Sequence, residues 1–168
     1  RWALAGEAEI EGANGAKSRS LRQHHDWQRE DFPAGYFSPG VKPASTGATT
    51  LVLAHAARSV PAVSDLPLED DHLVEYDANG RKTWEWFAGD HIDELGLSPA
   101  ARAAIKAGAG AGAGPQRRSD FDWLHVNSAT YLGPNRWFDA GDARFDPRHI
   151  MISSRQASLL AIVARDGK

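Results

Sequence analysis

The sequence predicts an all-β fold that is built from repeated strand units and interrupted by one short helix. Three observations support this class. Short apolar or alternating segments bounded by turn residues recur along the chain. Two sets of these segments follow each other at a constant offset of 100 residues. The 168 residues are 42% hydrophobic and 24% charged, which is typical of a globular domain with its own core.

The strand segments are defined by their apolar runs. The stretches "TTLVLAHA" (49–56) and "HIMISSR" (149–155) each predict one short strand. The stretch "HLVEYDANGRKTWEWFA" (72–88) has alternating runs on both sides of "DANGR", so it predicts a β-hairpin. The final "LLAIVARDGK" resembles the first half of that hairpin and ends where a return strand is expected.

One helical insertion is predicted within residues 90–108. Ser98 is a suitable N-cap, Pro99 suits the first helical position, and Gly108 is a suitable end. The tract "GAGAGAGPQRR" (108–118) follows and predicts a surface loop by its composition. It does not predict a phosphate-binding loop, because no strand leads into it.

The repeat relates the two halves of the chain. His25 lies 30 residues before His55, and His125 lies 30 residues before Arg155. "TLVLAH" aligns with "IMISSR" without a gap, and "RWALAGE" at the start resembles "WEWFAGD" in the hairpin. Units of about four strands are typical of β-propeller blades enlarged by insertions. A β-sandwich remains the alternative fold.

This repeat divides the chain into four segments, and both ends are expected to be cuts through a longer protein. The segments are 1–23 (the end of a preceding blade and a linker), 24–90 (one blade), 91–121 (the helical insertion and the Gly/Ala-rich loop) and 122–168 (the next blade without its last strand).

Composition excludes several classes of function. The net charge of −3 predicts no binding of nucleic acid, because such proteins carry a basic field. The absence of cysteine excludes disulfides, thiolate metal sites and a cysteine nucleophile. No apolar run is long enough to span a membrane, and the first residues lack the pattern of a signal peptide.

The candidate site combines residues from both repeats. In a propeller, His25 and His125 would be equivalent positions on inner strands, and His55 and Arg155 would end the next strands. Within the stretch "DWLHVNS" (122–128), a strand would place His125 and Asn127 on one face.

Such a set of hydrogen-bond donors suits an anionic group whose charge migrates during reaction. It therefore predicts phosphoryl or sulfuryl transfer rather than peptide hydrolysis. His24 is the weaker member of its pair, because it would point away from His25 in an extended strand.

No metal site is predicted. The acidic stretches "PLEDDH" (67–72) and "DAGDARFD" (139–146) lack the spacing of a calcium loop, so both are interpreted as solvated loops. The sequence also lacks an HExxH zinc motif and a GxSxG nucleophile elbow.

Four longer stretches resemble the bacterial arylsulfotransferases, in family order, over about residues 20–168. "DWLHVNS" followed by a strand ending in "SSR" is the most specific part. The stretches are "HHDWQRE", "LEDDHLVEYDANGRKTWEWFAGDHIDELG", "DFDWLHVNSATYLGPNRWFDAGDARFDP" and "HIMISSRQASLLAIVARDGK".

The resemblance implies a six-bladed β-propeller, of which this chain would hold about two blades. It implies transfer of a sulfuryl group from a phenolic sulfate ester to a phenol, without a cofactor and without a nucleotide sulfate donor. In the family a channel-facing histidine is transiently sulfated, while other His, Asn and Arg side chains bind the sulfuryl oxygens. Family members are often exported, which implies a periplasmic or secreted protein. The chain is also compatible with a homo-oligomer.

The family roles carry over residue by residue. His125 and Asn127 match the family's His-x-Asn pair, Arg155 matches the arginine of the "SSR" strand, and His25 matches the "HHD" segment, where His24 is the alternative. His55 is a secondary candidate from the repeat alone.

The family's nucleophilic histidine lies in a later "QHH" or "QHD" segment. We therefore expect it beyond Lys168, so that this chain alone would be inactive. Two other functions remain open: a non-catalytic propeller that serves as a binding module, and a sulfatase-like hydrolase on the same fold.

Overall fold

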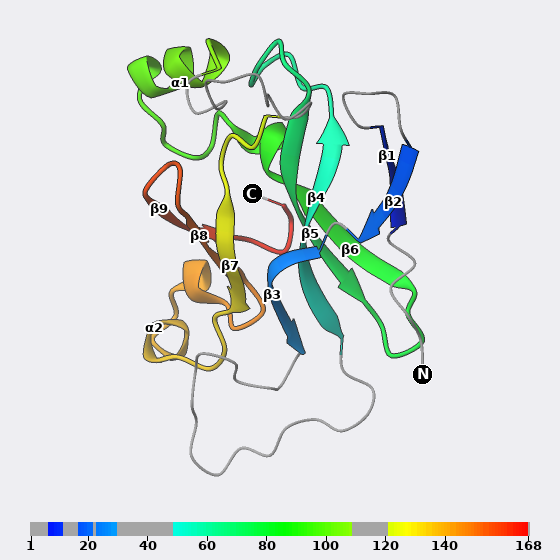
Figure 1. Ribbon diagram of the computed structural model, residues 1–168. Coiled ribbons are helices and arrows are strands. Elements are labelled where there is room, and N and C mark those ends of the chain that lie inside the picture. Colours follow the sequence, from blue (N-terminus) through cyan, green and yellow to red (C-terminus); the bar gives the residue numbers. More distant parts are fainter. Residues whose placement is uncertain (1–6, 12–16, 22, 30–48, 109–120, 168) are drawn as a thin grey trace.

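The computed structural model describes residues 7–11, 17–21, 23–29, 49–108 and 121–167. The described residues are mostly β and form antiparallel sheets with few helical segments, which confirms the all-β class (Figure 1). The strands are β1 (Glu7–Glu11), β2 (Lys17–Leu21), β3 (Gln23–Arg29), β4 (Thr50–Arg58), β5 (Leu68–Tyr76), β6 (Lys82–Phe87), β7 (Val126–Tyr131), β8 (Ile150–Ser154) and β9 (Leu159–Val163). The helical segments are η1 (Ala88–His91), α1 (Pro99–Lys106), α2 (Arg136–Asp139) and η2 (Ala143–Phe145).

The larger sheet has the strand order β3-β4-β5-β6, in which each strand pairs with its neighbour in sequence. The predicted hairpin is present as β5 and β6. At its turn, one carboxylate oxygen of Asp77 accepts the backbone N–H groups of Asn79 and Arg81, each at 2.9 Å. Gly80 adopts a φ of 80°, a conformation that glycine reaches without steric cost.

The smaller sheet has the order β7-β8-β9, and β1 pairs only with β2. β7 lies beside β3 of the larger sheet (Figure 1). Asp26 accepts the backbone N–H of Ala129 at 3.0 Å, and Gln28 accepts that of Tyr131 at 2.8 Å. Side chains of β3 thus satisfy backbone groups of β7 and join the two sheets at their first strands.

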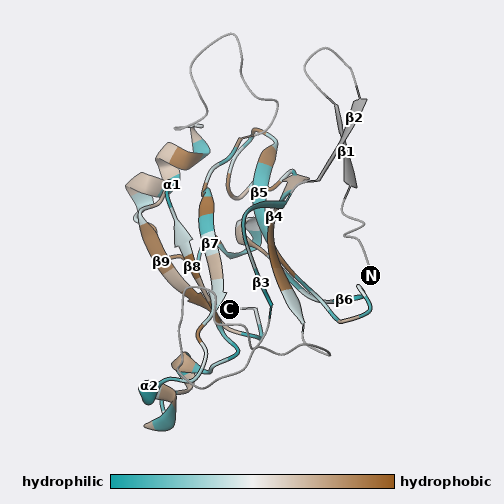
Figure 2. Cartoon of the chain, turned by 60° about the horizontal axis from the view of Figure 1, so that its bottom comes forward, coloured by the Kyte–Doolittle hydropathy of each residue, from teal (hydrophilic) through white to brown (hydrophobic). Residues whose placement is uncertain are grey.

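The two sheets share one hydrophobic core. Leu51 and Leu53 of β4 are fully buried, as are Ile150 and Ile152 of β8 at 0% and 1% exposure. Figure 2 shows apolar stretches along β4 and β9, where the repeat placed its apolar segments. Burial of such side chains is the main stabilising contribution to a domain of this size.

The predicted helix is confirmed as α1. Ser98 caps it by accepting the N–H of Ala101 at 3.1 Å, Pro99 opens it, and Gly108 follows it with a φ of 78°. Lys106 ties the helix to the loop before β5, where it contacts Asp65 at 2.6 Å. The Gly/Ala-rich tract after Gly108 lies outside the described residues.

The interpretation of residues 67–72 as a solvated loop is wrong. β5 begins at Leu68, and the side chains of Asp70 and Asp71 are 0% exposed. The physical reason is tertiary: the partners of both carboxylates lie on other elements, so no local pattern revealed their burial. The second acidic stretch, 139–146, is mostly exposed and holds the end of α2 and all of η2.

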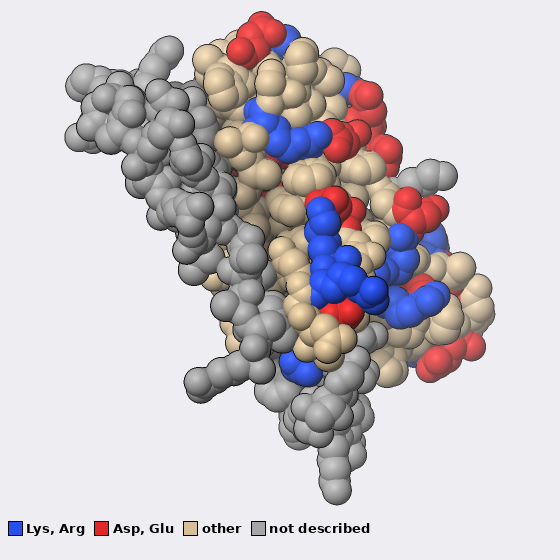
Figure 3. Space-filling model, turned by 90° about the vertical axis from the view of Figure 1, so that its right-hand side faces the viewer, with Lys and Arg blue, Asp and Glu red and all other residues tan. Residues whose placement is uncertain are grey.

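The described surface mixes charges of both signs. In Figure 3 the basic side chains on the viewed face lie next to acidic ones rather than forming a field of one sign. None of the helices in the described part of the chain has the length and apolar character to cross a bilayer.

Candidate functional site

Six titratable side chains gather where β3, β4 and β5 meet the segment leading into β7. They form a connected series of four imidazoles and two carboxylates, which we call the histidine cluster. Its members, in spatial order, are His24, Asp71, His55, Asp122, His125 and His25. The cluster therefore draws residues from four separate regions of the sequence.

His25 and His125 come into direct contact, although they lie 100 residues apart in sequence. Their Nε2 atoms are 3.1 Å apart, and their rings meet edge to face. Both residues adopt the left-handed conformation, with φ of 50° and 51°, which few residues other than glycine adopt. The pKa of His25 is lowered, first by desolvation and then by His24 and His125.

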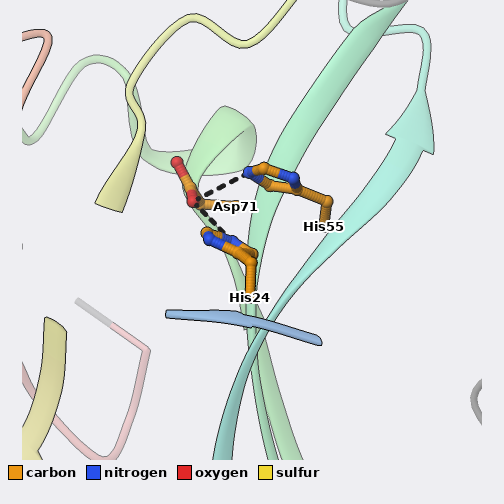
Figure 4. Close-up of side chains that lie close together, drawn as sticks. All are labelled: His24, His55 and Asp71. Carbon is orange, nitrogen blue, oxygen red and sulfur yellow. Dashed lines mark ion pairs between the residues drawn. The ribbon is translucent and has the colours of Figure 1, made fainter. Parts of the chain in front are cut away.

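Asp71 holds the other two histidines (Figure 4). One of its carboxylate oxygens lies 3.3 Å from Nε2 of His24 and 3.5 Å from Nε2 of His55, whose rings stack at 3.6 Å. The carboxylate also accepts the backbone N–H of Val126 at 3.1 Å. It thus fixes the start of β7 against β5.

The charges of Asp71 and His55 support one another. Burial opposes ionisation of Asp71, but His24, His55 and the Val126 N–H outweigh it and lower the pKa of Asp71. Burial likewise opposes a charge on His55, but Asp71 outweighs it and raises the pKa of His55. The buried carboxylate therefore stays ionised and favours an imidazolium at His55.

Asp122 connects the two halves of the cluster. Its Oδ2 lies 2.5 Å from Nδ1 of His125, and its Oδ1 lies 3.9 Å from Nε2 of His55. The neighbouring side chains of Phe121 and Trp123 are each 3% exposed, so the backbone around Asp122 is anchored in the core.

His24, His55 and Asp71 also have the composition of a metal site. One ligand atom from each lies within 4.8 Å of the others. However, a metal ion binds imidazole in the plane of the ring, and the two rings here stack face to face with only 27° between their planes. Both rings would have to rotate before they could bind one ion, so the observed arrangement suits ion pairing with Asp71 better.

Asn127 and Arg155 lie beside this cluster rather than within it. Asn127 is half-buried at an irregularity in β7, between the pairs formed by Val126 and Ser128. The backbone N–H of Arg155 donates to the carbonyl oxygen of His125 at 3.0 Å, but its side chain is exposed. β8 ends at Ser154, so Arg155 occupies a turn instead of continuing the strand.

Two local expectations about these residues are wrong. His125 precedes β7 and has a positive φ, so strand alternation does not relate it to Asn127. For the same reason, extended geometry does not orient His24 and His25: both belong to the cluster, and each has its own partner. His24, which the sequence predicted to be the weaker site candidate of the two, contacts the buried Asp71.

Sequence reasoning missed both carboxylates of the cluster. The available signal for Asp122 was its spacing, because it precedes His125 by three residues within the most specific motif. Asp71 offered no such signal, because it is one of three consecutive acids, Glu69 to Asp71.

We expect replacement of His55 by glutamine to destabilise the protein most at mildly acidic pH. A raised pKa means that His55 contributes stability below about pH 6.5, and that this contribution is lost as pH rises through its folded-state pKa. The difference in unfolding free energy between the two proteins should therefore shrink from pH 6 to pH 9, measured by chemical denaturation.

His72 provides the matched control on the neighbouring strand. Burial lowers its pKa despite Glu85, so protonation of His72 opposes folding and its cost grows as pH falls. The His72→Gln difference should therefore change with pH in the opposite direction. Parallel pH profiles for the two variants would contradict the assignment of His55.

One comparison with known proteins identifies a family for this chain. A family model described as Arylsulfotransferase (ASST) matches residues 27–168. No significant match was found among curated proteins or among solved structures.

Proposed function

Because the chain belongs to the arylsulfotransferase family, we propose that it forms part of a site that transfers a sulfuryl group from a phenolic sulfate ester to a phenol. Transfer proceeds through a sulfated histidine and uses no nucleotide sulfate donor. The family assignment supports the transferase class, and the histidine cluster supports the location of the site.

The contact between His25 and His125 is the observation that carries this proposal. Two imidazoles whose Nε2 atoms lie 3.1 Å apart hold a single proton between them. An imidazole pair of this kind can donate a proton to a leaving phenolate and later accept one from a phenol near neutral pH. Ester exchange between two phenols requires both of these proton transfers.

The chemistry balances in two steps. A histidine nitrogen attacks sulfur, so that an N–S bond forms and the S–O bond to the donor breaks. The electron pair stays on the phenolate oxygen, which takes a proton from the singly charged form of the His25–His125 pair, in which one ring is an imidazolium, and the pair becomes neutral. The acceptor phenol then returns a proton to the pair and attacks sulfur, which releases the histidine.

Asn127 and Arg155 would bind the sulfuryl oxygens. Both side chains offer hydrogen-bond donors, and the backbone of Arg155 is bonded to His125. The exposed guanidinium of Arg155 can turn toward a bound anion without first breaking a buried contact.

We also propose that the larger sheet (β3-β4-β5-β6) and the smaller sheet (β7-β8-β9) are adjacent blades of a propeller. The sheets place β3 and β7 side by side as their first strands, and β4 and β8 begin 100 residues apart at Thr50 and Ile150. The matching backbone conformations of His25 and His125 support the same equivalence.

The proposal is tested with 4-nitrophenyl sulfate and the protein as its gene encodes it. We expect release of 4-nitrophenol that depends on added phenol, and a loss of about 10²–10³-fold in the His125→Ala and Arg155→Ala variants. His149→Ala is the control, because His149 lies outside the cluster and contacts the carbonyl oxygen of Arg144.

Release that is independent of phenol would indicate a hydrolase instead. Full turnover in the Arg155→Ala variant would show that Arg155 does not bind the sulfuryl group. No turnover with any phenolic sulfate would leave a binding module as the better description.

A further inference from the structure

We propose that Asp122 is a positioning residue that fixes the tautomer of His125 and thereby places a shared proton between His125 and His25. The catalytic meaning of this assignment rests on the proposed function. The tautomer itself can be measured independently of any turnover.

The geometry of the pair determines which nitrogen carries a proton. Oδ2 of Asp122 lies 2.5 Å from Nδ1 of His125, and the two side chains are 18% and 21% exposed. An ionised carboxylate can only accept hydrogen bonds, so Nδ1 of His125 must be the donor. In a neutral His125 the other nitrogen, Nε2, therefore carries a lone pair.

This tautomer has a consequence at the next contact in the series. Nε2 of His125 faces Nε2 of His25 at 3.1 Å, and one of the two nitrogens must donate. With a lone pair on His125, the proton belongs to Nε2 of His25. Asp122 thus determines, through His125, which ring of the neutral pair donates its Nε2 proton, and the pair becomes an acid for the leaving oxygen when it takes up one further proton.

The backbone holds this arrangement in place before any ligand binds. The carbonyl oxygen of His125 accepts the N–H of Arg155 at 3.0 Å, and Leu124 is fully buried. Trp123, which follows Asp122, donates its indole N–H to the buried Asp70 at 3.1 Å. Trp123 and Leu124, the two residues between Asp122 and His125, are therefore anchored, which is the preorganisation that acid–base catalysis requires.

Asp122 is better suited to this role than Asp71. Asp71 contacts two imidazoles and a backbone N–H, and neither of these imidazoles belongs to His25 or His125. Asp122 is the carboxylate that contacts His125 itself, and only its Oδ1 faces the other half of the cluster.

The first experiment measures histidine tautomers by long-range ¹⁵N–¹H NMR on the wild-type protein with labelled histidine. We expect His125 to carry its proton on Nδ1 and His25 to carry its proton on Nε2. A proton on Nε2 of a neutral His125 would overturn the proposal without any need for a variant.

The second experiment replaces Asp122 by asparagine, whose amide can donate to Nδ1 and so reverse the tautomer of His125. We expect the proton to move to Nε2 and phenol-dependent turnover to fall about 10²–10⁴-fold. Asp122→Glu keeps a carboxylate acceptor, so it should retain much of the wild-type tautomer of His125 and much of the phenol-dependent turnover. Asp142→Asn is the matched control, because Asp142 pairs with the exposed Arg144 and contacts no histidine.

The outcomes separate the two proposals. An unchanged tautomer in a folded Asp122→Asn protein would overturn the positioning role, even if transfer activity is found. The expected tautomers in a protein that transfers no sulfuryl group would contradict the proposed function alone. A variant with the reversed tautomer but wild-type turnover would show that the shared proton is not used.

Discussion

Replacing Asp70 by alanine is expected to destabilise the protein by about 3–5 kcal/mol, the largest effect on stability that we expect from any single change. Asp70 is fully buried on β5 and accepts from Arg58 at 2.8 Å, from the backbone of Gly89 at 2.9 Å and from the indole of Trp123 at 3.1 Å. Alanine would leave all three donors without this acceptor, two of them within the core.

Asp90 is the matched control, because it binds the same arginine from the surface. It lies 2.7 Å from the other terminal nitrogen of Arg58, and its side chain is 47% exposed. Asp90→Ala should therefore cost less than about 1 kcal/mol. Urea denaturation of both variants measures the comparison, and equal losses would show that the burial of Asp70 adds nothing.

Replacing Glu75 by alanine is expected to cost about 3 kcal/mol, at the lower end of the range for breaking a buried ion pair. Glu75 is 3% exposed and holds the guanidinium of Arg165 by two bonds of 2.7 and 2.6 Å. It also accepts the hydroxyl of Tyr131 at 2.5 Å. The cost is limited because Arg165 is 28% exposed and can be partly hydrated after the change.

Glu85 on the paired strand β6 is the control for Glu75. It forms a 2.7 Å ion pair with Lys82, but its side chain is 36% exposed. Glu85→Ala should change the unfolding free energy by less than about 1 kcal/mol. A loss for Glu75→Ala as small as that would mean that Arg165 finds water or another partner at no cost.

The local elements could largely be predicted from the sequence. The hairpin of β5 and β6 was visible from its alternation and its turn, and α1 was visible from Ser98, Pro99 and Gly108. These features depend on residues within a few positions of each other. Propensity and capping therefore indicate these elements without knowledge of any tertiary contact.

The candidate site was predictable only in part, because its geometry depends on distant contacts. The repeat singled out His25 and His125 as equivalent, and the structure brings them together. The positive φ at both positions replaces the strand alternation that had been assumed for them. Asp71 and Asp122 were missed because a carboxylate shows its role only through the partner that it meets in the folded chain.

The three buried acids of β5 also influence the order in which the chain can fold. Within the larger sheet each strand pairs with the next in sequence, so those contacts close short loops. Besides nearer partners such as Arg58, Gly89 and His55, the acids Asp70, Asp71 and Glu75 also meet partners that lie 53, 55 and 90 residues away. Until those partners arrive, β5 carries hydrated carboxylates among its apolar side chains, and charge of this kind discourages the association of incompletely folded chains. The smaller sheet must remove that water as it docks, which makes the joining of the two sheets a late and high-contact-order step.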